Sequence, residues 1–297
     1  MAIKTSDQLS AEDISASKQL LMPLSPPLLD DLKMHMPIKI KKSLGQHFLT
    51  DAAVSSQIVN LLTDESLVGT VVEVGPGRGS LTEMLLCKSI ADLYLVEVDR
   101  ELIPYLKKQY PQLSSRIIAA DFLALPLADL FEGRRLTIIG NFPYNISSQI
   151  FFKILENRHV VHEVVGMVQK EVAQRMAAQP GSKAYGILSL FLQAFYRVEY
   201  HFTVPPDLFL PPPKVDSAVI TMHRNSVKKL PCNEQLFFQI VKSGFQQRRK
   251  KLHNALRAFN TSNMGCADLL NKRAEELSVA EFVALTNALA TNRVGCS

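Results

Sequence analysis

The stretch TVVEVGPGRG, residues 70–79, decides the fold. A run rich in β-branched residues enters a glycine-rich turn, and residues 80–86 then carry apolar side chains at helical spacing. Glycine permits a sharp turn and lets the main chain approach a ligand closely, which is why Gly75 and Gly77 stand out. A strand, such a turn and a helix in succession predict a ligand site at the carboxyl end of a parallel sheet.

Strand-like and helix-like segments alternate from this stretch to about residue 224. We expect strands at 70–74, 93–98, 116–120, 136–139, 163–168, 198–204 and 215–223. The alternation predicts an α/β fold, a Rossmann-like and mostly parallel sheet covered on both faces. Only a proline-rich loop, 205–213, joins the last two runs, so they should form an antiparallel hairpin at the sheet edge. Five parallel strands closed by such a hairpin are typical of class I methyltransferases rather than dehydrogenases.

The chain divides into three predicted regions. Residues 1–36 are expected to be a flexible leader, because they are polar and interrupted by Pro23, Pro26 and Pro27. Residues 37–224 hold the sheet. Residues 225–297 show no strand signal and are predicted to form a small all-helical domain, with one helix over 236–259 and another over 267–290.

Composition excludes several classes of protein. The 297 residues are 47% hydrophobic and 21% charged, which supports a packed core and argues against wholesale disorder. None of the four cysteines lies in a C-x-x-C pair, so we expect neither a disulfide framework nor a metal site, and a cytoplasmic location. No apolar run is long enough to span a bilayer, and we expect no membrane association.

Acidic residues close the strands that follow the glycine turn. Glu97 comes about 20 residues after it, where a carboxylate accepts hydrogen bonds from both hydroxyls of a ribose. Asp121 is placed to accept from an adenine amino group, with Phe122 against the ring. Glu73 before the turn favours a cationic ligand such as S-adenosylmethionine, because it would repel a pyrophosphate. On this stretch alone, a dinucleotide site and an ordinary tight turn remain open.

The tetrapeptide Asn141-Phe142-Pro143-Tyr144 follows the fourth predicted strand and suits one chemical problem. The amino nitrogen of adenine is a poor nucleophile, because its lone pair is delocalised into the ring. The Asn141 side-chain oxygen and a main-chain carbonyl at Phe142 or Pro143 can each accept one N6–H and orient the nitrogen. Pro143 fixes the backbone, and Tyr144 can stack on a flipped-out base. The alternative is a plain proline turn with a buried tyrosine.

Seven separated stretches together resemble the ribosomal RNA adenine dimethyltransferases of the KsgA type. They are SLGQHFL (43–49), VEVGPGRGSLTE (72–83), LVEVDREL (95–102), GNFPYNIS (140–147), MVQKEVAQRM (167–176), PPPKVDSAV (211–219) and FQQRRKKLHNAL (245–256). The resemblance implies N6,N6-dimethylation of two adjacent adenosines near the 3′ end of 16S rRNA, during biogenesis of the small ribosomal subunit, with S-adenosylmethionine as methyl donor. The chemistry of the tetrapeptide already makes Asn141, Pro143 and Tyr144 the predicted catalytic residues.

The resemblance places cofactor contacts on His47, Leu49, Gly75, Glu97, Asp121 and Asn141, to which we add Gly77. Two positions depart from the family pattern. The family usually has Asn where this chain has His47, and a main-chain contact would survive that change whereas a side-chain contact would not. The family usually has Leu or Ile where this chain has Phe142, which leaves the carbonyl geometry intact.

Basic residues concentrate near the C-terminal end. Nine lie between Arg224 and Arg257, opposed only by Glu234. A solvated helix face is the plain interpretation; next to a base-modifying pocket we favour a surface that binds RNA phosphates. The predicted RNA contacts are Lys42, Arg248, Arg249, Lys250 and Lys251. The expected partner is 16S rRNA within the small ribosomal subunit, bound by a monomer.

Three rival functions use the same fold. A 23S rRNA dimethyltransferase of the antibiotic-resistance type would carry nearly the same motifs, although SKAYG (182–186) and an expected QRRKK helix (247–251) favour the small-subunit enzyme. A non-catalytic rRNA-binding assembly or transcription factor is disfavoured by Asn141 and Tyr144. A DNA adenine methyltransferase would more often have Asp at 141 and lacks a basic helical tail.

Overall fold

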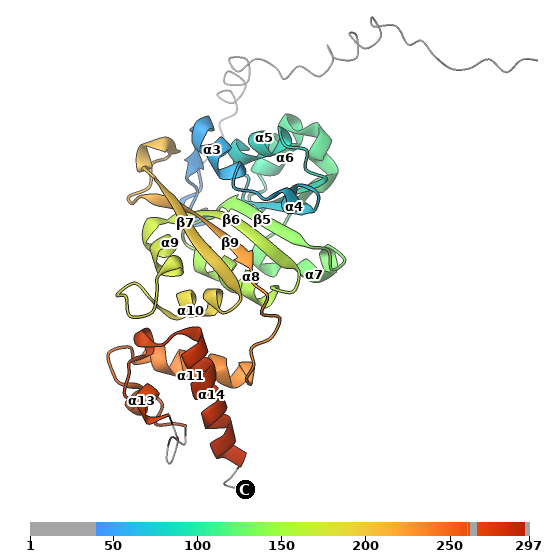
Figure 1. Cartoon of the computed structure of the whole chain (residues 1–297). Coiled ribbons are helices and arrows are strands. Elements are labelled where there is room, and N and C mark those ends of the chain that lie inside the picture. Colours follow the sequence, from blue (N-terminus) through green and yellow to red (C-terminus); the bar gives the residue numbers. More distant parts are fainter. Residues whose placement is uncertain (1–39, 260, 262–265, 295–297) are drawn as a thin grey trace, which may run out of the picture. The chain divides into compact units, whose positions relative to one another are not determined.

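A computed structural model of the chain describes residues 40–259, 261 and 266–294 (Figure 1). The predicted leader, residues 1–36, lies outside the described residues. The described residues belong to one unit that begins at Ile40.

The predicted strands form a seven-stranded sheet in the order β4-β3-β2-β5-β6-β9-β7. Their bounds are Ile117–Ala119, Asp92–Glu97, Thr70–Val74, Leu136–Asn141, Val161–Gln169, Ser217–Arg224 and Tyr196–Val204, in that order. The first five strands are parallel, and β9 pairs antiparallel with both β6 and β7. The Rossmann-like sheet and its antiparallel edge hairpin are therefore confirmed.

Helices cover both faces of this sheet. They are α3 (Ala52–Val59), α4 (Asp64–Leu67), α5 (Ser80–Leu86), α6 (Leu102–Gln109), α7 (Leu127–Leu130), α8 (Ser147–Glu156), α9 (Lys170–Ala177) and α10 (Ile187–Gln193). Figure 1 shows α3, α5 and α6 above the sheet and α8 and α10 below it. All five residues of β2 are buried, as expected for a central strand of a parallel sheet with two covered faces.

Short 3₁₀ turns and a second, two-stranded sheet lie in the connections. The turns are η2 (Lys42–Leu44), η3 (Pro111–Arg116), η4 (Phe122–Ala124) and η5 (Pro206–Leu208). The small sheet pairs β1 (Phe48–Leu49) with β8 (Phe209–Leu210), which lies inside the proline-rich loop between β7 and β9. The loop was predicted only as a connection, yet it ties the N-terminal segment to the sheet edge.

Strand register brings the functional stretches to one edge. Val74 at the end of β2 pairs with Val96, and Glu97 at the end of β3 pairs with Ala119 of β4. On the other side of β2, Glu73 pairs with Ile139 of β5, two residues before Asn141. Because the strands are parallel, the turns that follow them open at the same edge.

Phe142 fits a space that two glycines leave. Its side chain is fully buried, and its main-chain N–H donates to the Met167 carbonyl at 3.0 Å. A Cβ at Gly166 would lie 2.5 Å from the Phe142 ring, and a Cβ at Gly140 would lie 2.5 Å from the Val74 carbonyl oxygen and 3.0 Å from the same ring. The large side chain is thus accommodated without displacing the tetrapeptide.

The C-terminal region corrects the prediction of two long helices. It contains α11 (Glu234–Gln246), α12 (Leu252–Ala255), α13 (Ala267–Leu270), the 3₁₀ turn η6 (Ala274–Glu276) and α14 (Val279–Val294). The QRRKK stretch is a turn and not a helix. Tertiary contacts interrupt the helix at this stretch. Lys251 forms an isolated antiparallel β-bridge with Arg273, and the Leu252 N–H donates to the Lys272 carbonyl at 2.8 Å.

These helices pack against the sheet region through aromatic side chains. The Phe191 ring of α10 meets the Phe238 ring of α11 edge-on, with centroids 4.8 Å apart. Phe237 on the same helix is fully buried and contacts both Phe191 and Phe282. A C-terminal helical region is present as expected, and the proposed domain boundary at 224/225 stays a prediction.

Candidate active site at the carboxyl edge of the sheet

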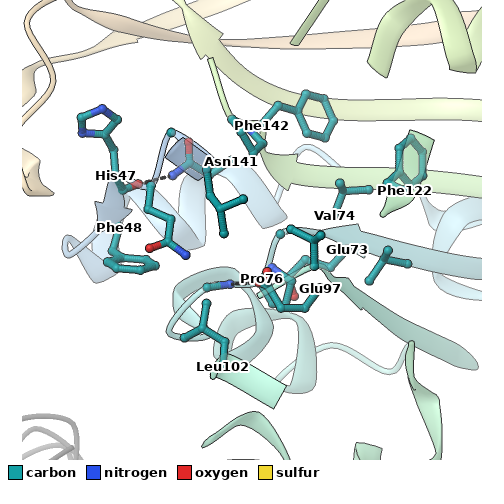
Figure 2. A pocket seen from close by; sticks show the side chains of 18 of the residues that line it. His47, Phe48, Glu73, Val74, Pro76, Glu97, Leu102, Phe122, Asn141 and Phe142 are labelled. Atoms are coloured by element: carbon teal, nitrogen blue, oxygen red, sulfur yellow. Dashed lines mark hydrogen bonds between the residues drawn. The ribbon is translucent and has the colours of Figure 1, made fainter. Parts of the chain in front are cut away.

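One pocket of about 930 Å³, its open mouth included, lies at the carboxyl ends of the parallel strands. It is lined by every residue predicted for catalysis or cofactor binding: His47, Leu49, Gly75, Gly77, Glu97, Asp121, Asn141, Pro143 and Tyr144. Figure 2 shows Glu97 beside Pro76 of the glycine turn, with Asn141 above them on the other side of the space. The glycine turn and the tetrapeptide therefore share one rim, as predicted.

Gly75 and Gly77 both have a positive φ, 66° and 57°, but they do different things. A Cβ at Gly75 would meet nothing within 4 Å, so this position faces open space. A Cβ at Gly77 would lie 2.8 Å from the Phe48 ring of β1. Gly77 therefore allows Phe48 to pack on the turn, and Gly75 leaves room for a ligand.

Glu97 is held by main-chain donors. Its side chain is 5% exposed. One carboxylate oxygen accepts from the Gly77 N–H at 3.2 Å and the other from the Asp99 N–H at 2.9 Å. Burial raises the pKa of Glu97, and these N–H groups offset part of the rise. Each oxygen keeps a second lone pair for a ligand hydroxyl.

Glu73 overturns the electrostatic argument made from sequence. The side chain is 1% exposed and accepts a hydrogen bond from Thr82 Oγ1 at 2.6 Å. Burial raises its pKa to about 8, so the carboxyl is mostly protonated at neutral pH. The prediction that Glu73 contributes a negative charge beside the turn is wrong, because the sequence did not show how deeply the strand lies.

Asp121 and Phe122 begin η4 after β4. Asp121 is exposed and one of its oxygens accepts from the Leu123 N–H at 2.9 Å, as the cap of that turn. Phe122 is buried at 3% exposure and lines the pocket. The second carboxylate oxygen of Asp121 has no recorded donor among the described residues and remains available to a ligand.

Asn141 is oriented by His47. Its side-chain Nδ2 donates to the His47 carbonyl at 2.7 Å, the bond drawn as a dashed line in Figure 2. Because the amide nitrogen is used, the Oδ1 atom is left as an acceptor. The main-chain carbonyl of His47 thus performs a task that does not depend on its side chain, so the change from the family's Asn leaves this contact intact.

The His47 ring lies against Tyr144 instead of the glycine turn. The two rings are stacked, with centroids 5.4 Å apart and an interplanar angle of 24°. His47 Nδ1 is 2.8 Å from the Pro211 carbonyl oxygen, which only accepts, so Nδ1 carries the proton. The Tyr144 hydroxyl bonds with Ser217 Oγ. Both rings are therefore held from two directions.

The two candidate carbonyls of the tetrapeptide differ. The Pro143 oxygen accepts the Ile146 N–H at 3.2 Å, which closes a turn. The Phe142 carbonyl has no recorded donor among the described residues. The geometry therefore favours Phe142 over Pro143 as the main-chain acceptor for a ligand N–H.

A side-chain clasp that the sequence analysis missed holds the N-terminal segment beside the pocket. Asp99 is 2% exposed and accepts from Lys41 Nζ at 2.5 Å and Gln46 Nε2 at 2.8 Å. Burial alone would raise the pKa of Asp99, but Lys41, the Glu101 N–H and Gln46 together hold it below its ordinary value. Lys41 is thus a structural cation and not a free one. In the sequence, the only indication of this contact was Asp99, the acidic residue two positions after Glu97.

The predicted RNA contacts divide into free and engaged side chains. Lys42, Arg249, Lys250 and Lys251 are exposed. Arg248 instead forms an ion pair with Glu275 through Nε and donates from Nη2 to the Lys183 carbonyl at 2.5 Å. It fastens the C-terminal helices to the loop before α10.

Within the part of the chain that the structure describes, no group of three or more His, Cys, Asp or Glu side chains is arranged to hold a metal ion. In the same residues, no helix has the length and apolar character required to cross a bilayer.

Comparison with known proteins gives consistent matches across most of the chain. A family model described as ribosomal RNA adenine dimethylase matches residues 38–291. The "ribosomal RNA small subunit methyltransferase A" of Cytophaga hutchinsonii is 51% identical over 253 residues, which cover 85% of this chain and 98% of that protein. The protein of the same name in Bacteroides thetaiotaomicron is 51% identical over 252 residues, covering 84% and 94%.

Two solved structures share the fold. A dimethyladenosine transferase from Plasmodium falciparum superposes with a TM-score of 0.68 at 24% identity, covering 84% of this chain and 98% of that one. The 23S rRNA methyltransferase ErmE superposes with a TM-score of 0.63 at 22% identity, covering 82% and 99%. At these identities the likeness establishes the architecture, which is the class I methyltransferase fold.

Proposed function

The chain belongs to the ribosomal RNA adenine dimethylase family, and from that premise we propose that it dimethylates N6 of two adjacent adenosines near the 3′ end of 16S rRNA. The substrate is the small ribosomal subunit during its biogenesis, and the methyl donor is S-adenosylmethionine. The observation that carries the proposal is the single pocket in which Glu97 and Asn141 face the same space.

The pocket residues fit the proposed donor. When bound, S-adenosylmethionine supplies a methyl group activated by its sulfonium. The free lone pairs of Glu97 would accept from the two ribose hydroxyls, and the unused oxygen of Asp121 would accept from the adenine amino group, with Phe122 against that ring. Leu49, Gly75 and Gly77 complete the wall around it.

Asn141 and Phe142 orient the target nitrogen. Because Asn141 Nδ2 is committed to His47, its Oδ1 accepts one N6–H, and the Phe142 carbonyl accepts the other. Two acceptors on one side favour a pyramidal nitrogen with its lone pair directed at the methyl carbon. Tyr144 stacks on the flipped-out base, a contact of about 1–3 kcal/mol.

Two successive transfers follow from the same two acceptors. After the first transfer the nitrogen keeps one N–H, so one acceptor still orients it for the second. After the second transfer no N–H is left, and the loss of both hydrogen bonds favours release. The amine becomes acidic once methylated and loses its proton without a strong base, so the residues act by orientation and by exclusion of water.

The exposed cations supply the contacts to RNA. Lys42, Arg249, Lys250 and Lys251 bind phosphates of the folded substrate, an interaction that weakens with salt. Arg248 contributes indirectly, because it holds the turn that carries Arg249 and Lys250. We propose that the protein acts as a monomer in the cytoplasm, where the small subunit is assembled.

The small-subunit target is preferred to its rival for a specific reason. Relatives about half identical to this chain bear the small-subunit name, whereas the 23S enzyme ErmE shares only the fold. A purely non-catalytic assembly factor would have no use for an Asn141 side chain held with its oxygen free.

Labelled methyl transfer tests the proposal. The full chain is incubated with S-adenosylmethionine carrying a labelled methyl group and with unmethylated small or large ribosomal subunits, and the labelled base is mapped. We expect N6,N6-dimethyladenosine at two adjacent positions near the 3′ end of 16S rRNA. Label in 23S rRNA would support the rival enzyme, and binding of small subunits without label would support the non-catalytic factor.

A further inference from the structure

A run of hydrogen bonds connects the end of β3 with the tetrapeptide across the N-terminal segment. The main-chain N–H of Asp99 donates to Glu97 at 2.9 Å, and the Asp99 carboxylate accepts from Gln46 Nε2 at 2.8 Å. The next residue is His47, whose carbonyl accepts from Asn141 Nδ2 at 2.7 Å. The residue assigned to the donor and the residue assigned to the target base are therefore joined through Asp99 and Gln46. This inference rests on the proposed function, from which those two assignments come.

The Asp99 carboxylate is fully engaged and shielded from water. Its side chain has an exposed fraction of 0%. Oδ1 accepts from Lys41 Nζ at 2.5 Å and from the Glu101 N–H at 3.0 Å, and Oδ2 accepts from Gln46 Nε2. A buried carboxylate strongly favours the arrangement in which its donors stay in place, because an unpaired charge in the interior is costly. Asp99 thus fixes the position of the Gln46 amide.

Gln46 is held at both ends of its amide. Nε2 donates to Asp99, and Oε1 accepts from the main-chain N–H of Lys41 at 2.8 Å. A flipped amide would direct an oxygen at the carboxylate and a nitrogen at a donor, so one orientation is strongly preferred. The pairing of β1 with β8 begins at Phe48. The carbonyl of His47 therefore lies between that pairing and the fixed Gln46 side chain.

We propose that Asp99 is a positioning residue for methyl transfer, which acts through Gln46 on the His47 carbonyl and so on the Asn141 oxygen that accepts the adenine N6–H. The competing explanation is that Asp99 anchors the N-terminal segment and contributes to stability alone. The two explanations differ in whether loss of the bond between Asp99 and Gln46 changes what Asn141 contributes to the rate.

Reversal of this hydrogen bond provides the first test. Asp99→Asn places an amide nitrogen against a donor in either orientation, Gln46 Nε2 in one and Lys41 Nζ in the other, and Gln46→Glu places two carboxylates against each other. The double variant Asp99→Asn/Gln46→Glu restores one donor and one acceptor with the same total charge. With unmethylated small subunits and saturating S-adenosylmethionine, we expect the single-turnover rate per folded molecule to fall about tenfold in each single variant. The double variant should recover to within about threefold of wild type.

Donor affinity separates positioning from cofactor binding. The Asp99 N–H that donates to Glu97 belongs to the main chain, so the substitutions leave that bond in place. The dissociation constant for S-adenosylmethionine, measured by calorimetry, should therefore stay within about threefold of wild type in all three variants. A loss confined to this constant, with an unchanged rate at saturation, would overturn the positioning role.

Coupling to Asn141 gives a readout that a purely structural role would not move. Asn141→Ala should lower the rate about tenfold less in the Asp99→Asn background than in the wild-type chain, because the acceptor is already displaced there. The exposed acid Asp129 of α7 lies outside the pocket lining. Asp129→Asn, the same change at that position, should leave the rate and the cost of Asn141→Ala unchanged.

Each result decides between the explanations. Unchanged rates in both single variants, a double variant no faster than the singles, or an equal cost of Asn141→Ala in both backgrounds would overturn the role of Asp99 and leave the proposed function standing. If Asp99→Asn does not fold, Gln46→Ala decides by the same rate and coupling measurements, because it removes the link and keeps the ion pair between Lys41 and Asp99. Wild-type protein that methylates no small subunits would overturn the proposed function, and with it this inference.

Discussion

The carboxyl edge of the sheet and the C-terminal helical region use charged and polar side chains in opposite ways. At the sheet edge, Glu97 and Asn141 are held by main-chain groups and keep free lone pairs toward the pocket. In the helical region, Arg248, one of the five predicted RNA contacts, is instead bonded to Glu275 and to the Lys183 carbonyl. A parallel sheet dictates where its strand ends lie, so position predicts function there. A run of basic residues carries no such constraint.

Removal of Asn141 should have the largest effect at the sheet edge. Asn141→Ala deletes the oriented acceptor and should lower the methylation rate by about 10²–10³-fold, by analogy with the loss of one preorganised transition-state hydrogen bond. The dissociation constant for S-adenosylmethionine should change only a few-fold. Single-turnover rates and calorimetry measure the two quantities. Asn60→Ala, the same change at an exposed position after α3, serves as the control, and normal turnover by Asn141→Ala would refute the assigned role.

Loss of Glu97 should affect cofactor binding more than the chemical step. Glu97→Ala removes the acceptor for the ribose hydroxyls and frees the Gly77 and Asp99 N–H groups, so we expect affinity for S-adenosylmethionine to fall about tenfold to a hundredfold. Glu156→Ala, at an exposed acid ending α8, should leave it unchanged. An unaltered dissociation constant in Glu97→Ala would remove this residue from the site.

The pKa of Glu97 gives this prediction a pH dependence. Burial raises that pKa above the ordinary value of 4.5, and the charged form is the better acceptor. Affinity for S-adenosylmethionine should therefore fall as the pH is lowered through the raised pKa, at a higher pH than an ordinary glutamate would require. Glu97→Ala should lose this dependence, and its persistence in the variant would assign it to another group.

Substitutions of the adjacent residues Arg248 and Arg249 should distinguish a residue that stabilises the fold from one that contacts RNA. Arg248→Ala should lower the free energy of unfolding by about 1–2 kcal/mol, because a charged hydrogen-bonded pair is broken. Arg249→Ala should stay within about 0.5 kcal/mol of wild type and reduce the salt dependence of RNA binding by about one phosphate contact. Chemical denaturation and RNA titrations at several salt concentrations measure both. A loss of stability in Arg249→Ala together with unchanged stability in Arg248→Ala would contradict the structure.

Much of the sheet region could be predicted because local and global signals agree there. The strand 70–74, the turn after it and the helix 80–86 match β2 and α5 to the residue. The pairing of β1 with β8 could not be predicted, because two-residue strands have no periodicity. The burial of Glu73 could not be predicted either. How deeply its side chain lies depends on the helices packed on the two faces of the sheet around β2, and a single acidic residue before a turn does not reveal this.

The prediction of two long helices in the C-terminal region was wrong, and the sequence contained one of the signals that would have corrected it. Ser278 and Glu281 form a reciprocal capping box, with the Ser278 N–H donating to Glu281 at 2.8 Å and the Glu281 N–H to Ser278 Oγ at 3.3 Å. That Ser-x-x-Glu pattern marks the start of a helix, and it lies inside the range predicted as one continuous helix. The break at 247–251 follows mainly from contacts with 272–275, which are tertiary and leave no local signature.

The last prediction concerns Glu73 and the stability of the sheet, and not methyl transfer or RNA binding. Its pKa of about 8 in the folded protein exceeds the ordinary 4.5, so the folded state holds a proton that the unfolded state releases between these values. The free energy of unfolding should then fall with rising pH across that window, by up to about 1.4 kcal/mol per pH unit. Glu73→Gln, which stays neutral, should remove this slope in urea titrations. Parallel slopes for the two proteins would show that Glu73 is already ionised in the fold.

The claim that both ligands meet in one pocket is tested most directly by a bisubstrate analogue, an adenosine joined through N6 to the amino-acid and nucleoside parts of the donor. Its dissociation constant should be weakened both by Glu97→Ala and by Asn141→Ala, because one molecule spans both loops, whereas S-adenosylhomocysteine should respond strongly to Glu97→Ala only. If Asn141→Ala left the affinity of the analogue unchanged, the tetrapeptide would not receive the adenine, and methyl transfer could not proceed by the proposed route.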